Sequence, residues 1–241
     1  MIRRTEFASG LRVVTERMPG VRSVALGFWV LAGSCDEPPE ISGSSHFLEH
    51  LLFKGTSTRS AQDIAEAFDA VGGNLNAYTA KETTVFHARV LDRDLPMAVD
   101  HLADMLRDST LRPADLESER QVILEEINMY EDAPDEIVHD LFQENLWPDH
   151  PLGRPILGTK ASIRGASRAQ ILRFYRKHYR PGNLVVAAAG SVDHDALVRL
   201  LRRRLETGRV RGGGGGGRPP RAGRPPPPPA RPPPAGPPPP P

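Results

Sequence analysis

The sequence has little cysteine and no long apolar run. Its single cysteine, Cys35, excludes an intramolecular disulfide framework and a cysteine-rich zinc finger. No stretch reaches the roughly 18 apolar residues that a membrane-spanning helix needs, so we expect no membrane partner. The first twenty residues also lack the apolar core of a secretory signal, and we therefore expect a cytoplasmic protein.

Acidic residues are missing from the last 34 residues, Gly208 to Pro241, which hold 15 Pro, 9 Gly, 6 Arg, 3 Ala and one Val. The whole chain has a formal net charge of +1, so subtracting the six arginines of this segment leaves −5 on residues 1–207. Nucleic-acid-binding domains are usually basic, and we expect no nucleic-acid partner. The composition predicts a folded unit over 1–207 and a disordered tail over 208–241.

Two other interpretations of the tail stay open. Its proline runs favour polyproline II, the conformation that SH3-like domains bind. Gly, Pro, Ala and Arg also share GC-rich codons, so the segment could come from a shifted reading frame.

The pattern of apolar residues predicts a protein that contains both strands and helices. Strands are expected over 3–7, 11–16, 21–31, 74–79, 83–91 and 183–189, the last of them central. Helices are expected over 43–54, 61–71, 95–107, 114–130, 136–147, 169–178 and 194–205. This order predicts the α+β class, with helices packed on one face of a mainly antiparallel sheet.

An apolar helix carries three ionisable side chains in the segment His46-Phe47-Leu48-Glu49-His50. At 100° per residue, the two histidines and the glutamate lie within one 100° arc of the helix. Two histidines one turn apart can bind one Zn²⁺ as neutral imidazoles, and the glutamate beside them can take a proton from a zinc-bound water. The alternative is a pair of ordinary buried histidines with satisfied hydrogen bonds.

The helix over 114–130 offers a third ligand, because Glu119 and Glu126 fall inside its apolar stripe. The stripe also includes apolar side chains: Leu116, Val122, Ile123, Ile127 and Met129. Arg120 falls on the polar side. A carboxylate in a core-facing stripe is costly unless it is paired or bound to a metal, so both glutamates are candidates for the site. The alternative is a salt bridge to an arginine that lines the core.

The segments GSSHFLEHLLFKGTSTR and ESERQVILEEINMYEDAPDE together resemble the pitrilysin/insulinase family of zinc peptidases, the inverzincins. Within that family they are most similar to bacterial relatives of the mitochondrial processing peptidase β subunit. The resemblance implies one Zn²⁺ per chain, bound by His46, His50 and Glu126. It also implies that Glu49 is the general base and that Glu119 is a second glutamate supporting catalysis.

The segment GGNLNAYTAKETTVF resembles the edge strand of the same family, in which Asn76 and Ala77 would lie along the backbone of a bound peptide. The resemblance therefore implies a metalloendopeptidase acting on extended peptides. Members of this family usually have two homologous halves that close around the substrate. This sequence resembles only the first half, so a second homologous half or subunit is an expected partner.

Two other functions stay open. The chain could be a non-catalytic assembly subunit or an inactive fragment of the same fold, although such relatives typically lose part of the H-x-x-E-H motif, which is intact here. Another inverzincin chemistry, that of S-ribosylhomocysteine lyase, needs a cysteine ligand downstream of the motif, whereas Cys35 precedes it.

Overall fold

The computed structural model describes residues 1–206, and the tail predicted over 208–241 lies outside them. The strands are β1 (Ile2–Glu6), β2 (Arg12–Arg17), β3 (Ser23–Val30), β4 (Asn74–Thr79), β5 (Thr84–Leu91) and β6 (Leu184–Gly190). The α-helices are α1 (Ser44–Leu52), α2 (Ala61–Asp69), α3 (Leu95–Asp108), α4 (Pro113–Glu131), α5 (Pro134–Leu146), α6 (Lys160–Gly165), α7 (Arg168–His178) and α8 (His194–Leu201). A π-helical turn, Arg202–Glu206, follows α8.

The strands form one mixed sheet in the order β1-β2-β6-β3-β5-β4. Neighbouring strands are antiparallel except β2 and β6, which run parallel. The apolar strand β6 lies inside the sheet between β2 and β3, which confirms its predicted central position. In the described part of the chain, strand β4 pairs only with β5 and so forms one edge of the sheet.

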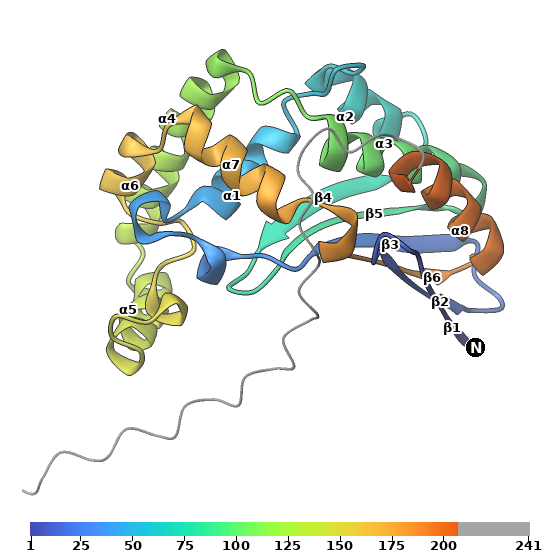
Figure 1. Cartoon of the computed structure of the whole chain (residues 1–241), viewed down its shortest axis with the longest axis horizontal. Helices are drawn as coiled ribbons and strands as arrows, with labels where there is room; N and C mark the ends of the chain where they lie inside the picture. Colours follow the sequence, from blue (N-terminus) through green and yellow to red (C-terminus); the bar gives the residue numbers. More distant parts are fainter. Residues whose placement is uncertain (207–241) are drawn as a thin grey trace, which may run out of the picture.

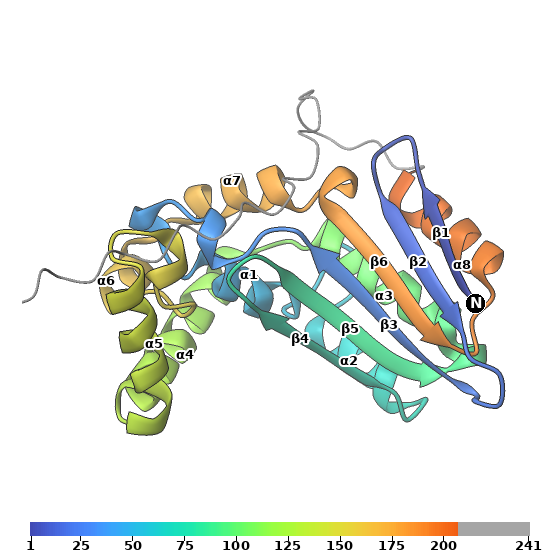
Figure 2. The same cartoon turned by 90° about the horizontal axis from the view of Figure 1, so that it is seen from below.

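Helices α2, α3 and α8 cover one face of the sheet, whereas the opposite face carries no helix of the described chain (Figure 2). The predicted α+β class, with helices on one face, is therefore confirmed. The core lies between the sheet and these helices, and its largest side chains are fully buried: Phe28, Phe86, Leu102 and Met105. No described helix combines the length and the apolar character needed to cross a membrane.

The remaining helices, α1 and α4 to α7, gather beyond one end of the sheet (Figure 1). There α1 contacts β4, β5, α4 and α7. Its apolar side chains are fully buried: Phe47, Leu48, Leu51 and Leu52. Because these residues fix how α1 is packed, His46, Glu49 and His50 are left on the side that faces α4 and the end of β4.

Three side chains of α4 differ in exposure from the helical periodicity predicted for residues 114–130. Val122 and Met129 are 42% and 73% exposed, since they lie at the margin of the stripe that neighbouring helices cover. Arg120, predicted on the polar side, is buried, and its guanidinium donates to the main-chain oxygens of Ile163 and Ala166. These oxygens lie at the end of α6, a helix that the sequence analysis did not predict, where carbonyls lack intrahelical partners.

Candidate metal centre

His46 and His50 lie one turn apart on α1 with their rings edge to face. Their Nε2 atoms are 3.3 Å apart. Burial lowers the pKa of His46 to about 4, and the neighbouring His50 contributes to this shift. His46 is therefore neutral at pH 7, which is the form that binds a metal ion.

Glu126 on α4 brings a carboxylate to both histidines. Its Oε2 atom lies 3.7 Å from Nε2 of His46 and 3.6 Å from Nε2 of His50. This oxygen is buried and has no hydrogen-bond partner among the described residues. The ligand atoms of the three side chains all lie within 4.8 Å of one another, as a metal site requires.

The three separations fit a zinc ion. Ligand atoms about 2.1 Å from a tetrahedral zinc lie about 3.4 Å from each other, and the observed values are 3.3, 3.6 and 3.7 Å. Two imidazole nitrogens and a carboxylate oxygen are a donor set of catalytic zinc sites, which keep a fourth position open. The residues that the resemblance implies as ligands are thus brought together with suitable chemistry.

Glu119, the other glutamate in the stripe of α4, lies on the outer side of His50. Its Oε2 atom is 3.1 Å from Nδ1 of His50, and its Oε1 atom is 2.7 Å from Nζ of Lys54. The ion pair considered from the sequence thus exists, but with a lysine. When Nδ1 donates its proton to Glu119, Nε2 keeps its lone pair towards Glu126. This geometry allows Glu119 to orient the ring of His50, a candidate metal ligand.

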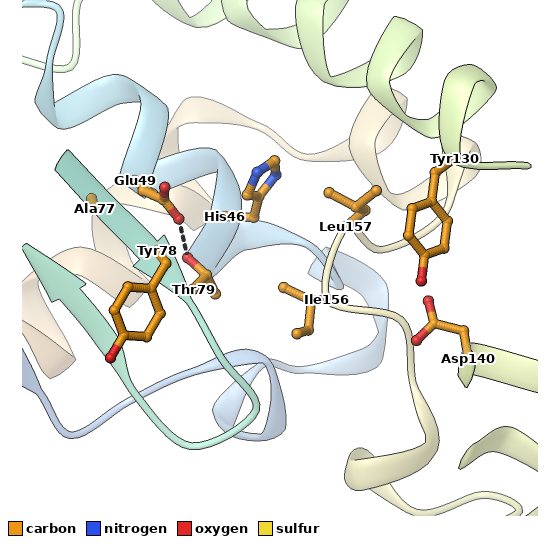
Figure 3. Close-up of a pocket in the computed structure, with 9 residues that line it drawn as sticks. All are labelled: His46, Glu49, Ala77, Tyr78, Thr79, Tyr130, Asp140, Ile156 and Leu157. Carbon is orange, nitrogen blue, oxygen red and sulfur yellow. Dashed lines mark hydrogen bonds between the residues drawn. The ribbon is translucent and has the colours of Figure 1, made fainter. Parts of the chain in front are cut away.

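Glu49 lies beside the histidines, and its carboxylate accepts a 2.6 Å hydrogen bond from Oγ1 of Thr79 at the end of β4 (Figure 3). Burial raises the pKa of Glu49; the nearby Glu126 adds to this, whereas Thr79 and His50 oppose it. A carboxyl group with a raised pKa next to a metal centre is suited to accept and return a proton.

A cleft of about 350 Å³ opens in front of His46 and Glu49. Its other lining residues are Ala77, Tyr78, Thr79, Tyr130, Asp140, Ile156 and Leu157 (Figure 3). The Asp140 carboxylate from α5 faces the Tyr130 hydroxyl across the cleft from Glu49. One wall is therefore the edge strand β4, and the opposite wall carries an acidic side chain.

The two residues predicted to contact substrate lie on β4 as expected. Ala77 lines the cleft, whereas Asn76 is exposed on the strand. The main-chain N–H of Ala77 donates to Oδ1 of Asn76 at 2.8 Å. A side chain thus holds a main-chain donor at the edge of the sheet.

Sequence analysis missed Lys54, Thr79 and Asp140. Lys54 comes four residues after His50, and Thr79 comes two residues after Ala77, so helical and strand spacing could have placed both beside the site. No local signal marks Asp140, because α5 approaches the cleft only through the tertiary fold.

The family model of the insulinases, peptidase family M16, matches residues 12–160, which is more than half of the chain. The chain belongs to peptidase family M16. A second model of that family, the M16 inactive domain, matches residues 165–240. Both matching models therefore come from the same peptidase family.

Curated relatives of this M16 chain are named zinc proteases. One from Streptomyces coelicolor is 54% identical over 205 residues, which cover 85% of this chain and 45% of that protein. YmxG of Bacillus subtilis is 48% identical over 192 residues, which cover 80% of this chain and 47% of that protein. The chain therefore spans about half the length of the curated relatives it matches.

Solved structures agree on the fold. A protease from Helicobacter pylori has a TM-score of 0.81 at 23% identity, covering 86% of this chain and 50% of that one. A putative M16-like peptidase from Alicyclobacillus acidocaldarius has a TM-score of 0.77 at 27% identity, and the match covers 85% of this chain and 49% of that one. In both cases the match takes up about half of the solved chain.

Proposed function

We propose that this chain is the metal-bearing half of a zinc-dependent metalloendopeptidase that hydrolyses peptide bonds in extended, unfolded peptides. One observation carries the proposal: His46, His50 and Glu126 converge on one point, and Glu49 lies beside it in the same cleft. Membership of the M16 family and the likeness to proteins named zinc proteases support both the metal and the reaction class.

Zinc held by His46, His50 and Glu126 would lower the pKa of a water molecule to about 7 and polarise the scissile carbonyl. Glu49 accepts a proton from the attacking water and passes it to the amine nitrogen of the leaving peptide. Its raised pKa brings the carboxyl group closer to the working pH for both transfers. The hydrogen bond from Thr79 keeps the carboxylate directed into the cleft.

The peptide lies along β4 as an added strand, because within residues 1–206 no strand pairs with the outer side of β4. A substrate carbonyl replaces Oδ1 of Asn76 as the acceptor for the N–H of Ala77. Asp140, on the opposite wall, suits a basic side chain of the substrate. Unfolded or presequence-like segments that carry such a side chain are the proposed substrates.

A second homologous half completes the substrate chamber, either in the same polypeptide or in a partner chain. The match to about half of each relative and the match to the M16 inactive domain support this arrangement. The alternative, a non-catalytic subunit or an inactive fragment, shares the fold and differs only in turnover.

The test compares the wild-type chain with the Glu49→Gln variant, each loaded with zinc. Each is mixed with the part of the Streptomyces coelicolor relative that lies outside its match to this chain. The substrate is an internally quenched, unstructured peptide. We expect cleavage that a chelator abolishes and zinc restores, and roughly hundredfold slower cleavage by Glu49→Gln at equal zinc content. If wild type and variant both bind zinc but neither cleaves the peptide, the inactive fragment is favoured. Full activity in Glu49→Gln would exclude Glu49 as the general base.

A further inference from the structure

Helix α1, which carries both histidines, begins without a capping side chain of its own. Its N-cap residue is Gly43, in the left-handed region with φ of +91°. A Cβ atom at this position would lie only 2.4 Å from the main-chain oxygen of Leu157, so no other residue fits there. Because the first N–H groups of a helix have no acceptor within it, α1 needs one from elsewhere in the chain.

Glu37, in the loop before α1, supplies that acceptor. Its Oε2 atom accepts the N–H of Gly43 and its Oε1 atom accepts the N–H of Ser45, both at 2.6 Å. The residue is only 3% exposed. Arg154 donates to its main-chain oxygen at 3.0 Å, which fixes the loop from the other side. Glu37 is thus a buried bridge between an anchored loop and the first turn of α1.

The position of the His46 ring depends on the first turn of α1 more than the position of the His50 ring depends on the turn that carries it. Nδ1 of His50 is held by Glu119. Nδ1 of His46 is buried and has no hydrogen-bond partner within residues 1–206. No hydrogen bond therefore fixes the outer edge of the His46 ring, and its place follows from the backbone that bears it. Ser45, whose N–H donates to Glu37, directly precedes His46 in that backbone.

We propose that Glu37 is a positioning residue of the metal centre, which sets the first turn of α1 and thereby the place of Nε2 of His46 relative to His50 and Glu126. The inference rests on the proposed metal-binding function. Outer groups that orient metal ligands typically change metal affinity by tenfold to hundredfold.

Two variants and one control test this role in the full-length chain. Glu37→Gln keeps the size of the side chain but turns an amide N–H towards one of the two donors. Glu37→Asp keeps the charge but is too short to reach both. Asp193→Ala, the control, removes the cap of α8, where Oδ1 of Asp193 accepts the N–H of Ala196 at 2.7 Å, far from the metal centre.

The measurements are the zinc dissociation constant, by competition with a chromogenic chelator, and the visible spectrum of the Co²⁺-loaded chain. We expect tenfold to hundredfold weaker zinc binding and an altered cobalt spectrum in Glu37→Gln, with a smaller loss in Glu37→Asp. Asp193→Ala should lower the urea midpoint and leave both metal readouts unchanged. If Glu37→Gln does not fold, Glu37→Asp decides.

Wild-type zinc affinity and an unaltered cobalt spectrum in the folded Glu37 variants would overturn the inference. The proposed metal-binding function would be unaffected by that result. A folded wild-type chain that binds neither ion would overturn the proposed function and the inference with it.

Discussion

Nδ1 of His50 lies 3.1 Å from Oε2 of Glu119, whose other oxygen is 2.7 Å from Nζ of Lys54. The carboxylate therefore connects the charge of Lys54, just beyond the C-terminus of α1, to the outer nitrogen of a candidate metal ligand on that helix. Glu119 itself is 4% exposed, and these two partners satisfy its buried carboxylate oxygens. The pair turns Nε2 of His50 towards Glu126 before any ion binds.

Glu119→Gln should weaken zinc binding by tenfold to hundredfold. The amide leaves Lys54 unpaired, and it no longer favours the His50 tautomer that presents its Nε2 lone pair to the metal. Zinc competition with a chromogenic chelator measures the loss. Glu125→Gln is the matched control, because Glu125 is exposed on the same helix. Equal affinity in both variants would show that Glu119 does not orient His50.

Asp140→Asn should lower kcat/KM about tenfold for peptides with Lys or Arg near the scissile bond and leave neutral peptides unaffected. The substitution removes the charge from the cleft but keeps the shape of the side chain. The comparison uses matched quenched peptides that differ at one position, with the completed two-half enzyme. A parallel loss for basic and neutral peptides would mean that Asp140 acts on the fold and not on substrate choice.

His178 should make the fold sensitive to acid. Burial lowers its pKa to about 4, and the nearby Lys177 and Arg180 contribute to this. For a base with a depressed pKa in the folded state, stability is complete above the unfolded value of about 6.5 and is lost as pH falls through 4. Between pH 7 and 4.5 the wild type should therefore lose about 1 kcal/mol more unfolding free energy than His178→Phe, after allowance for solvent screening.

Urea unfolding at pH 7, 5.5 and 4.5 measures this difference. The phenylalanine preserves the packing of the ring against Phe174, whose centroid is 4.4 Å from that of His178. Identical pH profiles for the two chains would contradict the assignment of acid sensitivity to His178.

Local patterns were enough to predict the strands and the helix that carries the motif. Periodicity predicted β4 at residues 74–79, and the structure has it at Asn74–Thr79. Ser60 caps α2 by accepting the N–H of Asp63 at 3.1 Å, an interaction between near neighbours. Both features depend on residues a few positions apart, which is the range over which sequence patterns are informative.

The outer parts of the site could not be predicted in this way. Asp140 reaches the cleft because α5 packs against α4, and Arg120 is buried because α6 ends beside it. Glu37 caps α1 across a loop of several residues instead of from the N-cap position. The first two contacts are set by tertiary packing and the third by the conformation of the loop, and the sequence has no periodic signal for either.

The proposed function requires that His46, His50 and Glu126 hold one metal ion. The most direct test is the zinc content of the purified full-length chain, measured by mass spectrometry of the metal beside the Glu126→Gln variant. We expect about one zinc per wild-type chain and a loss of most of it in the variant, with both chains folded by circular dichroism. A folded wild type without zinc, or a variant that keeps all of its zinc, would contradict it.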